Sequence, residues 1–229
     1  MLRLKSIKLY FFSILKLLFL SFRNYYLKTN FYNKKLEVGI LSRIFYNPSS
    51  YLTSSLTSTS SDYYKISNFS PELIWQTNIK DKLQFNNLHN FLWLTKIDRK
   101  NSKILTKDII KSWINKFFNY SPEVWDVEIT SKRIIAWTSN TDITLQDSEK
   151  SYKEKFFLSL NKQINFLVKN LKTLSNDSTK IICCSAIILS GIVFLENNSN
   201  QKFGIKELEK IVKIYFDKNG FPKSRNPEE

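Results

Sequence analysis

Residues 181–195 read IICCSAIILSGIVFL, an uncharged stretch bounded by Lys180 and Glu196. A helix that is apolar on every side is either buried in a protein core or embedded in a membrane. The stretch is shorter than the roughly 20 residues that a membrane span needs. Its small residues Ala186 and Gly191 suit close packing against a neighbouring helix. We therefore predict a buried core helix, with a membrane span as the less favoured alternative.

Amphipathic helices are predicted on both sides of this stretch. The helix before it has its N-cap at Asp147 or Ser148 and carries one apolar stripe over about six turns. The stripe consists of Tyr152, Phe156, Leu160, Ile164, Leu167, Leu171 and Leu174. The helix after it covers about residues 205–218 and ends at Asn219-Gly220, a pair typical of helix ends.

The middle of the chain also has a helical pattern. A first apolar face surrounds His89 and Trp93. Thr106 is expected to cap the next helix, with Asp108 in its first turn, and Ser131–Trp137 is expected to form a short helix. Only 4 Gly and 5 Pro occur and strand-like alternation is scarce, which argues against a β fold. The predicted fold class is all-α.

The residues that are scarce exclude several kinds of site. One histidine, His89, is too few for a His-rich zinc site or an H-E-x-x-H metalloprotease. The two cysteines, Cys183 and Cys184, are adjacent and cannot form a disulfide framework or a four-thiolate metal site. No glycine-rich phosphate loop occurs. We therefore expect no metal site and no cofactor in this chain.

Positive charge is concentrated at the N-terminus. The net charge is +15, and residues 1–35 contain eight Lys or Arg and no acid. The apolar run within them is interrupted by Lys8 and Lys16, and no small-x-small cleavage site follows Leu20. We predict a basic helix that docks on a partner or a membrane surface. An uncleaved anchor and a cleaved signal are the alternatives, so a cytoplasmic or peripheral membrane location is favoured over a periplasmic one.

A Ser/Thr-rich stretch divides the chain. Residues 47–70 contain no core-forming period and are predicted to be a linker. Residues 1–46 then form a basic helical segment, and residues 71–229 form the main helical domain.

Three groups of residues are candidates for a site. The first is Leu88–Leu94, where the lone histidine either lines a sugar cleft or lies in a core. The second is Trp125–Trp137, in which Asp126 and Glu128 are two residues apart and therefore suit capping or surface pairing better than acid–base catalysis. The third is Ser224-Arg225-Asn226, which is either a carboxylate-binding loop or a solvated terminus.

The order of these motifs resembles the N-terminal region of bacterial heparinase II/III-like proteins, over about residues 70–229. The motifs that carry the resemblance are L-H-x-F-x-W-L at 88–94, Trp113-Ile114, W-x4-T-x2-R-I-I-x-W at 125–137 and N-G-x3-S-R-N-P at 219–227. The resemblance implies an incomplete α/α toroid, in which helical hairpins curve around a cleft. It also implies a carbon–oxygen lyase that cleaves uronate-containing polysaccharides, such as alginate or a glycosaminoglycan, by β-elimination.

The same resemblance suggests roles for individual residues. Asn226, with Arg225 beside it, matches the family position that neutralises the uronate carboxylate. The substrate-binding candidates are His89, Trp93, Arg133 and Trp137.

The sequence also departs from the family. Asn219-Gly220 replaces the usual Asp-Gly, and Phe221-Pro222 replaces the Gly-His found in close relatives. The catalytic Tyr and His region and the C-terminal β-sandwich-like domain would lie beyond residue 229. We therefore expect this chain to be a fragment that is inactive alone.

Two other functions remain open. The chain could be a non-catalytic helical module that binds a membrane surface or another polyanion through residues 1–35. Nucleic-acid binding is the least favoured, because no recognised nucleic-acid module accompanies the basic charge.

Overall fold

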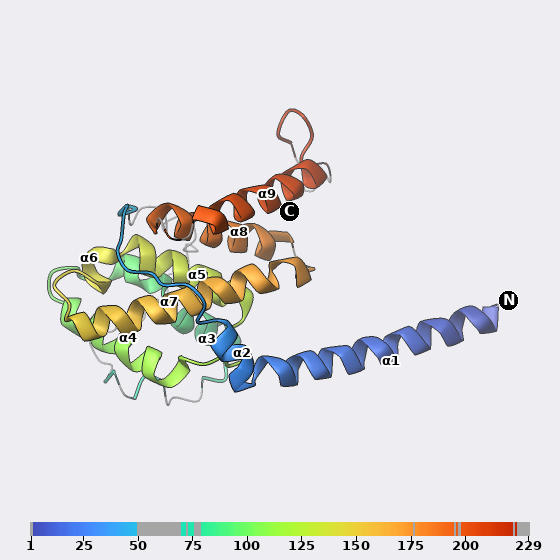
Figure 1. Cartoon of the computed structure of the whole chain (residues 1–229), viewed down its shortest axis with the longest axis horizontal. Coiled ribbons are helices and arrows are strands. Elements are labelled where there is room, and N and C mark those ends of the chain that lie inside the picture. The colour runs from blue at the N-terminus through green and yellow to red at the C-terminus, as the bar shows by residue number, and fades with distance from the viewer. Residues whose placement is uncertain are drawn as a thin grey trace.

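The computed structural model describes residues 2–49, 70–71, 73–75, 79–175, 177–194, 196, 198–221 and 223. These residues form helices and no β-strand, which confirms the all-α prediction (Figure 1). In chain order the helices are α1 (Leu2–Leu27), α2 (Asn30–Lys35), α3 (Lys82–His89), η3 (Leu92–Lys96), α4 (Lys103–Phe117), α5 (Val127–Ser139), α6 (Thr141–Thr144), α7 (Lys150–Asn170), η4 (Leu171–Thr173), α8 (Asp177–Val193) and α9 (Asn198–Tyr215).

Residues 181–193 lie in α8, and most of their side chains pack in the core as predicted, whereas Ile181 and Ile192 are partly exposed at 37% and 38%. Cys183, Cys184 and Ile187 have no exposed surface, and α8 packs between α5 and α9. Burial raises the pKa of the Cys183 thiol to about 12 and that of the Cys184 thiol to about 11, so both behave as small apolar residues. Across the described residues, no helix has the length and apolar character that a membrane crossing requires.

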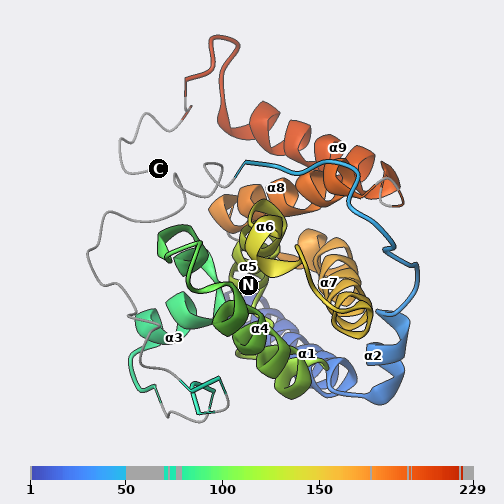
Figure 2. The ribbon, with the colours of Figure 1, turned by 90° about the vertical axis from the view of Figure 1, so that its left-hand side faces the viewer.

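Helix α5 lies at the centre of the body. Figure 2 looks along the bundle and shows α5 with α4, α7 and α8 around it. Ile134, Ala136 and Trp137 of α5 have no exposed surface. The Trp137 ring lies 5.4 Å from the Trp113 ring of α4 and 5.1 Å from the Phe156 ring of α7. Aromatic contacts across three helices therefore form much of the core.

Two of the predicted helix caps are wrong. Helix α4 begins at Lys103 after Ser102, which leaves Thr106 inside the helix. Helix α7 begins at Lys150 after Glu149, because Asp147 adopts a left-handed backbone conformation (φ 57°) in the preceding turn.

Capping by Asp126, in contrast, is confirmed. Its carboxylate accepts hydrogen bonds from the backbone N–H groups of Glu128 and Ile129, and α5 therefore starts at Val127, four residues earlier than expected. Glu128 forms an ion pair with Lys132 one turn later. Helix α9 likewise starts at Asn198, earlier than the predicted residue 205.

Residues 36–49 connect the N-terminal helices to the body along α7 (Figure 1). Asn161 of α7 donates hydrogen bonds to the backbone oxygens of Val38 and Gly39. The buried Lys162 ammonium lies 3.1 Å from Glu37 Oε1. The backbone N–H of Phe45 donates to the Val193 carbonyl at the end of α8. The rest of the predicted linker, residues 50–69, lies outside the described residues.

Candidate functional site

The four predicted substrate-binding residues lie together, and they lie in the core. His89 is 3% exposed and Trp93 is 8% exposed, whereas Arg133 and Trp137 have no exposed surface. The Trp113 ring connects three of them, since it lies 4.2 Å from the Arg133 guanidinium, packs on Trp137 and donates a hydrogen bond to His89. A polysaccharide would reach these side chains only if the packing around them opened. Their substrate-binding role stays a prediction.

Arg133 is held by uncharged oxygens. Its Nε donates to Gln163 Oε1 at 2.6 Å. Nη1 donates to the carbonyls of His89 and Val124, and Nη2 donates to Thr130 Oγ1. Burial lowers the pKa of the guanidinium well below its usual value, and Asp126 opposes that shift. Arg133 therefore joins α5 to α7 and to the end of α3.

The predicted carboxylate-neutralising pair, Arg225 and Asn226, lies outside the described residues. The turn before it is described: Gly220 adopts φ 84° and donates its N–H to the Asp217 carbonyl. Helix α9 ends at Tyr215, three residues before the predicted end at residue 218, and Asn219-Gly220 lies in the turn that follows.

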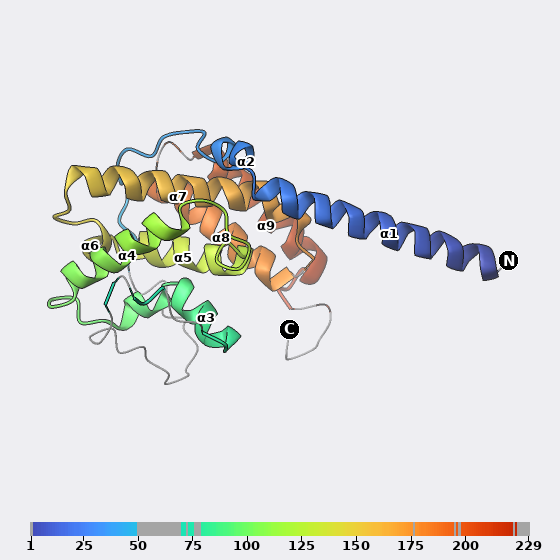
Figure 3. The ribbon, with the colours of Figure 1, turned by 90° about the horizontal axis from the view of Figure 1, so that it is seen from below.

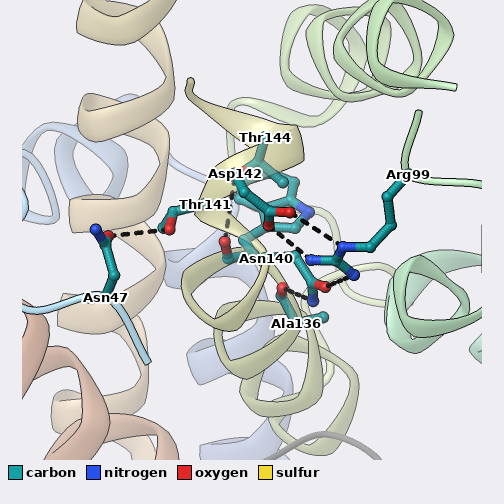
Figure 4. Close-up of polar contacts among 8 residues, drawn as sticks. Asn47, Arg99, Ala136, Asn140, Thr141, Asp142 and Thr144 are labelled. Carbon is teal, nitrogen blue, oxygen red and sulfur yellow. Dashed lines mark hydrogen bonds and ion pairs between the residues drawn. The ribbon is translucent and has the colours of Figure 1, made fainter. Parts of the chain in front are cut away.

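A polar cleft of about 770 Å³ opens on another face of the body. Figure 4 shows its polar contacts, which come from α6, the loop before α4 and residues 42–49. Its volume falls within the range of small-molecule and cofactor sites. The lining residues are Ser42, Arg43, Ile44, Asn47, Pro48, Ser49, Arg99, Ser139, Thr141, Asp142, Leu145, Gln146, Lys153 and Phe157.

An ordered set of hydrogen bonds forms one wall of the cleft (Figure 4). Arg99 makes a two-pronged ion pair with Asp142, with distances of 3.0 and 2.6 Å, and also donates to Asn140 Oδ1 at 3.0 Å. The Asn140 amide in turn donates to the Ala136 carbonyl. Thr141 Oγ1 donates to Asn47 Oδ1 at 3.0 Å, which joins α6 to the 42–49 segment.

Three cations line the cleft, and they differ in how far they are neutralised. Arg99 is paired with Asp142. Arg43 lies near Glu196 and helps to lower the pKa of that carboxyl. Lys153 is half-buried and forms no ion pair among the described residues. With Asp142 as the one acidic lining residue, the cleft favours a negatively charged ligand.

The floor of the cleft contains a polar atom without a partner. Ser139 is 2% exposed, and its hydroxyl makes no hydrogen bond within the described part of the chain. Because an unpaired buried hydroxyl costs about 1–3 kcal/mol, a ligand that bonds to it would recover that loss. A ligand in the cleft would reach this hydroxyl only if the side chains that cover it moved aside.

A second hollow of about 440 Å³ lies next to the cleft along α7. The two hollows share Ser42, Lys153 and Phe157 as lining residues. Leu158 and Gly39 add apolar and backbone surface to the second hollow. Two adjacent hollows of this kind suit an extended ligand better than a compact one.

The cleft could not be predicted from the sequence, because its residues share no local motif. Arg99, Ser139 and Lys153 come from three separate elements, and the fourth wall comes from residues 42–49. The one sequence signal was Asn140-Thr141-Asp142, a run of three polar residues directly after α5. Within the described parts of the chain, no cluster of three His, Cys, Asp or Glu side chains is arranged to hold a metal ion.

No family model, curated protein or solved structure matches this chain.

Proposed function

We propose that this chain binds an acidic, uronate-containing polysaccharide in the polar cleft, as the helical part of a heparinase II/III-like lyase. The observation that carries the proposal is a cleft that presents Arg43 and Lys153 and borders the buried, unpartnered Ser139 hydroxyl. The all-helical fold is compatible with the proposed α/α toroid.

The lining chemistry suits such a ligand. The Arg43 guanidinium and the Lys153 ammonium would bind uronate carboxylates through charge-assisted hydrogen bonds. Ser139 and Thr141 offer hydroxyls to the sugar hydroxyl groups. The half-buried Phe157 ring provides an apolar surface for one face of a sugar ring.

Turnover would need groups beyond those in the cleft. β-Elimination requires a neutralised carboxylate and a base that removes the neighbouring proton. His89 does not supply that base in this conformation, because it is buried and its Nδ1 already accepts a hydrogen bond from Trp113. Asn226 and Arg225 remain the proposed neutralising residues, and the base is proposed to come from the catalytic Tyr and His region of the family fold.

The direct test is calorimetric titration with alginate and heparin oligosaccharides. Lys153→Gln removes the cation without an ion pair, and we expect binding to weaken by about tenfold or more, the loss typical of one charge-assisted hydrogen bond. Lys206→Gln is the control, because it removes the same charge from an exposed position on α9, away from the cleft. Equal affinities for the two variants would contradict binding in the cleft.

A second measurement separates binding from catalysis. The unsaturated uronide formed by elimination absorbs ultraviolet light, so turnover is read directly from absorbance. We expect binding without product from this chain alone. Product formation by this chain would show that a base is present within it, while the absence of both binding and product would contradict the proposed function.

A further inference from the structure

Helix α1 exposes an unusual amount of apolar surface. Its large apolar side chains from residue 10 onward are mostly in water, and Figure 3 shows the helix extending beyond the body. The exposed residues are Tyr10, Phe11, Phe12, Ile14, Leu15, Leu17, Leu18, Phe19, Leu20, Phe22 and Tyr25. Contiguous apolar patches of this kind mark sites that bind another apolar surface.

The base of α1 is fixed to the body, so its direction is defined. Arg23 Nη2 donates to Asn170 Oδ1 at 2.7 Å and to Thr173 Oγ1 at 3.2 Å, at the end of α7 and in η4. The Tyr26 ring packs edge-on against the Tyr32 ring of α2 at 5.3 Å. The helix is therefore held at one end, and the rest of it is available to a partner.

Apolar side chains lie all around α1, and one side also carries its two basic residues from residue 10 onward. Positions 16 and 23 are seven residues apart, so Lys16 lies on the same side as Arg23, which faces the body. Ile14, Leu18 and Tyr25 lie on the opposite side and are exposed. An apolar layer could thus contact α1 from the outer side while the body stays in water.

The positive charge of residues 1–35 favours one apolar partner over others, an anionic lipid surface. Residues 1–35 contain eight Lys or Arg and no acid. The anionic surface of a bilayer attracts such a segment, with a gain of about fivefold in affinity for each basic residue near the lipid. Lys16 and Arg23 divide the apolar residues into runs too short to cross a bilayer. We infer that α1 lies flat on an anionic lipid surface, with its outer apolar side in the headgroup region and the helical body in water.

The inference does not depend on the proposed function of the cleft, and vesicle co-sedimentation of the full chain tests it. We expect tighter binding to mixed phosphatidylserine–phosphatidylcholine vesicles than to phosphatidylcholine vesicles. Leu18→Glu should weaken binding at least tenfold, because it removes a leucine that the lipid would bury and adds a charge that the anionic surface repels. Leu83→Glu is the matched control: Leu83 lies on α3 and is 63% exposed, compared with 62% for Leu18.

Charge and topology are tested in the same assay. Lys16→Gln should weaken binding to the anionic vesicles by no more than about fivefold, because Lys16 lies on the side of α1 away from the lipid, and should leave binding to phosphatidylcholine vesicles unchanged. Equal binding of Leu18→Glu and Leu83→Glu, or binding that ignores phosphatidylserine, would overturn the inference. So would resistance of bound protein to an alkaline carbonate wash, which would indicate a spanning helix.

A second copy of the chain is the competing partner for α1. Light scattering at increasing protein concentration distinguishes it from lipid. A dimer that Leu18→Glu disrupts, in a protein that does not bind anionic vesicles, would replace the lipid surface with a self-association interface. A monomer that binds those vesicles supports the inference.

Discussion

Trp113 donates its indole N–H to Nδ1 of His89 at 3.2 Å and thereby joins α4 to the end of α3. The bond needs an unprotonated Nδ1, so protonation of the imidazole breaks it. Burial is the main cause that lowers the pKa of His89 to about 3, and the positive charges of Arg133 and Lys116 lower it further. The histidine that the sequence suggested for a sugar cleft is a neutral member of the core.

This low pKa predicts a pH-dependent stability. An unfolded histidine has a pKa of about 6.5, so the unfolded chain takes up the proton first as the pH falls. The free energy of unfolding should therefore decrease from about pH 6.5 toward pH 3, by up to about 1.4 kcal/mol per pH unit for this group. Denaturant titrations between about pH 7 and pH 5 avoid most carboxylate titration.

The His89→Gln variant provides the control for that slope. Glutamine does not titrate, so the variant should show a flatter dependence on pH over the same range, whatever its absolute stability. Since the chain has one histidine, no other imidazole contributes. Identical slopes for the two proteins would contradict a depressed pKa at His89.

Arg133 is predicted to be one of the most sensitive positions in the fold. Arg133→Met would leave the His89 and Val124 carbonyls and Gln163 Oε1 without the donor they now share. We expect a loss of about 3–5 kcal/mol in unfolding free energy, as for other broken buried polar networks. Arg99→Met removes an exposed ion pair with Asp142 and should cost about 1 kcal/mol or less. Similar losses in both variants, measured by denaturant unfolding, would count against a structural role specific to Arg133.

The apolar pattern predicted the helices well, because the buried positions of a helix are apolar and recur every three or four residues in the sequence. The stretch at 181–195 was correctly placed in the core, and Asp126 was correctly favoured as a cap. Thr106 and Asp147 were wrong as caps, since several polar residues precede each helix and the backbone of the turn decides which one caps.

Functional residues were harder to predict. The motifs that contain His89 and Trp137 would have the same aromatic composition in a cleft or in a core. The packing of α4 and α7 against them places both residues in the core. Ser139 and Lys153 lack a local signal because tertiary packing alone brings them together. Arg225 and Asn226 lie outside the described residues.

Gly204 allows the close approach of α9 to α8. A Cβ at this position would lie 2.8 Å from Cγ1 of Ile188 and 3.2 Å from Cγ2 of Ile187. Gly204→Ala gains about 1 kcal/mol in helix propensity, but overpacking costs about 1–3 kcal/mol. We expect a net loss of stability in thermal or denaturant unfolding. In an Ile188→Ala background the same change should become neutral or stabilising, and an identical effect in both backgrounds would show that the clash is absent.

Substitution of Ser139 is predicted to have different effects on stability and on ligand binding. Its buried hydroxyl has no partner within the described residues, so Ser139→Ala should leave the unfolding free energy unchanged or raise it by about 1 kcal/mol. If a sugar bonds to that hydroxyl, the same variant should bind alginate oligosaccharides about fivefold more weakly in calorimetric titration. Ser190→Ala is the control, because Ser190 Oγ donates to the Ile187 carbonyl within α8 and should affect stability without changing affinity. A Ser139→Ala variant that loses stability and keeps full affinity would identify Ser139 as a structural residue and leave the cleft without its main evidence for a ligand.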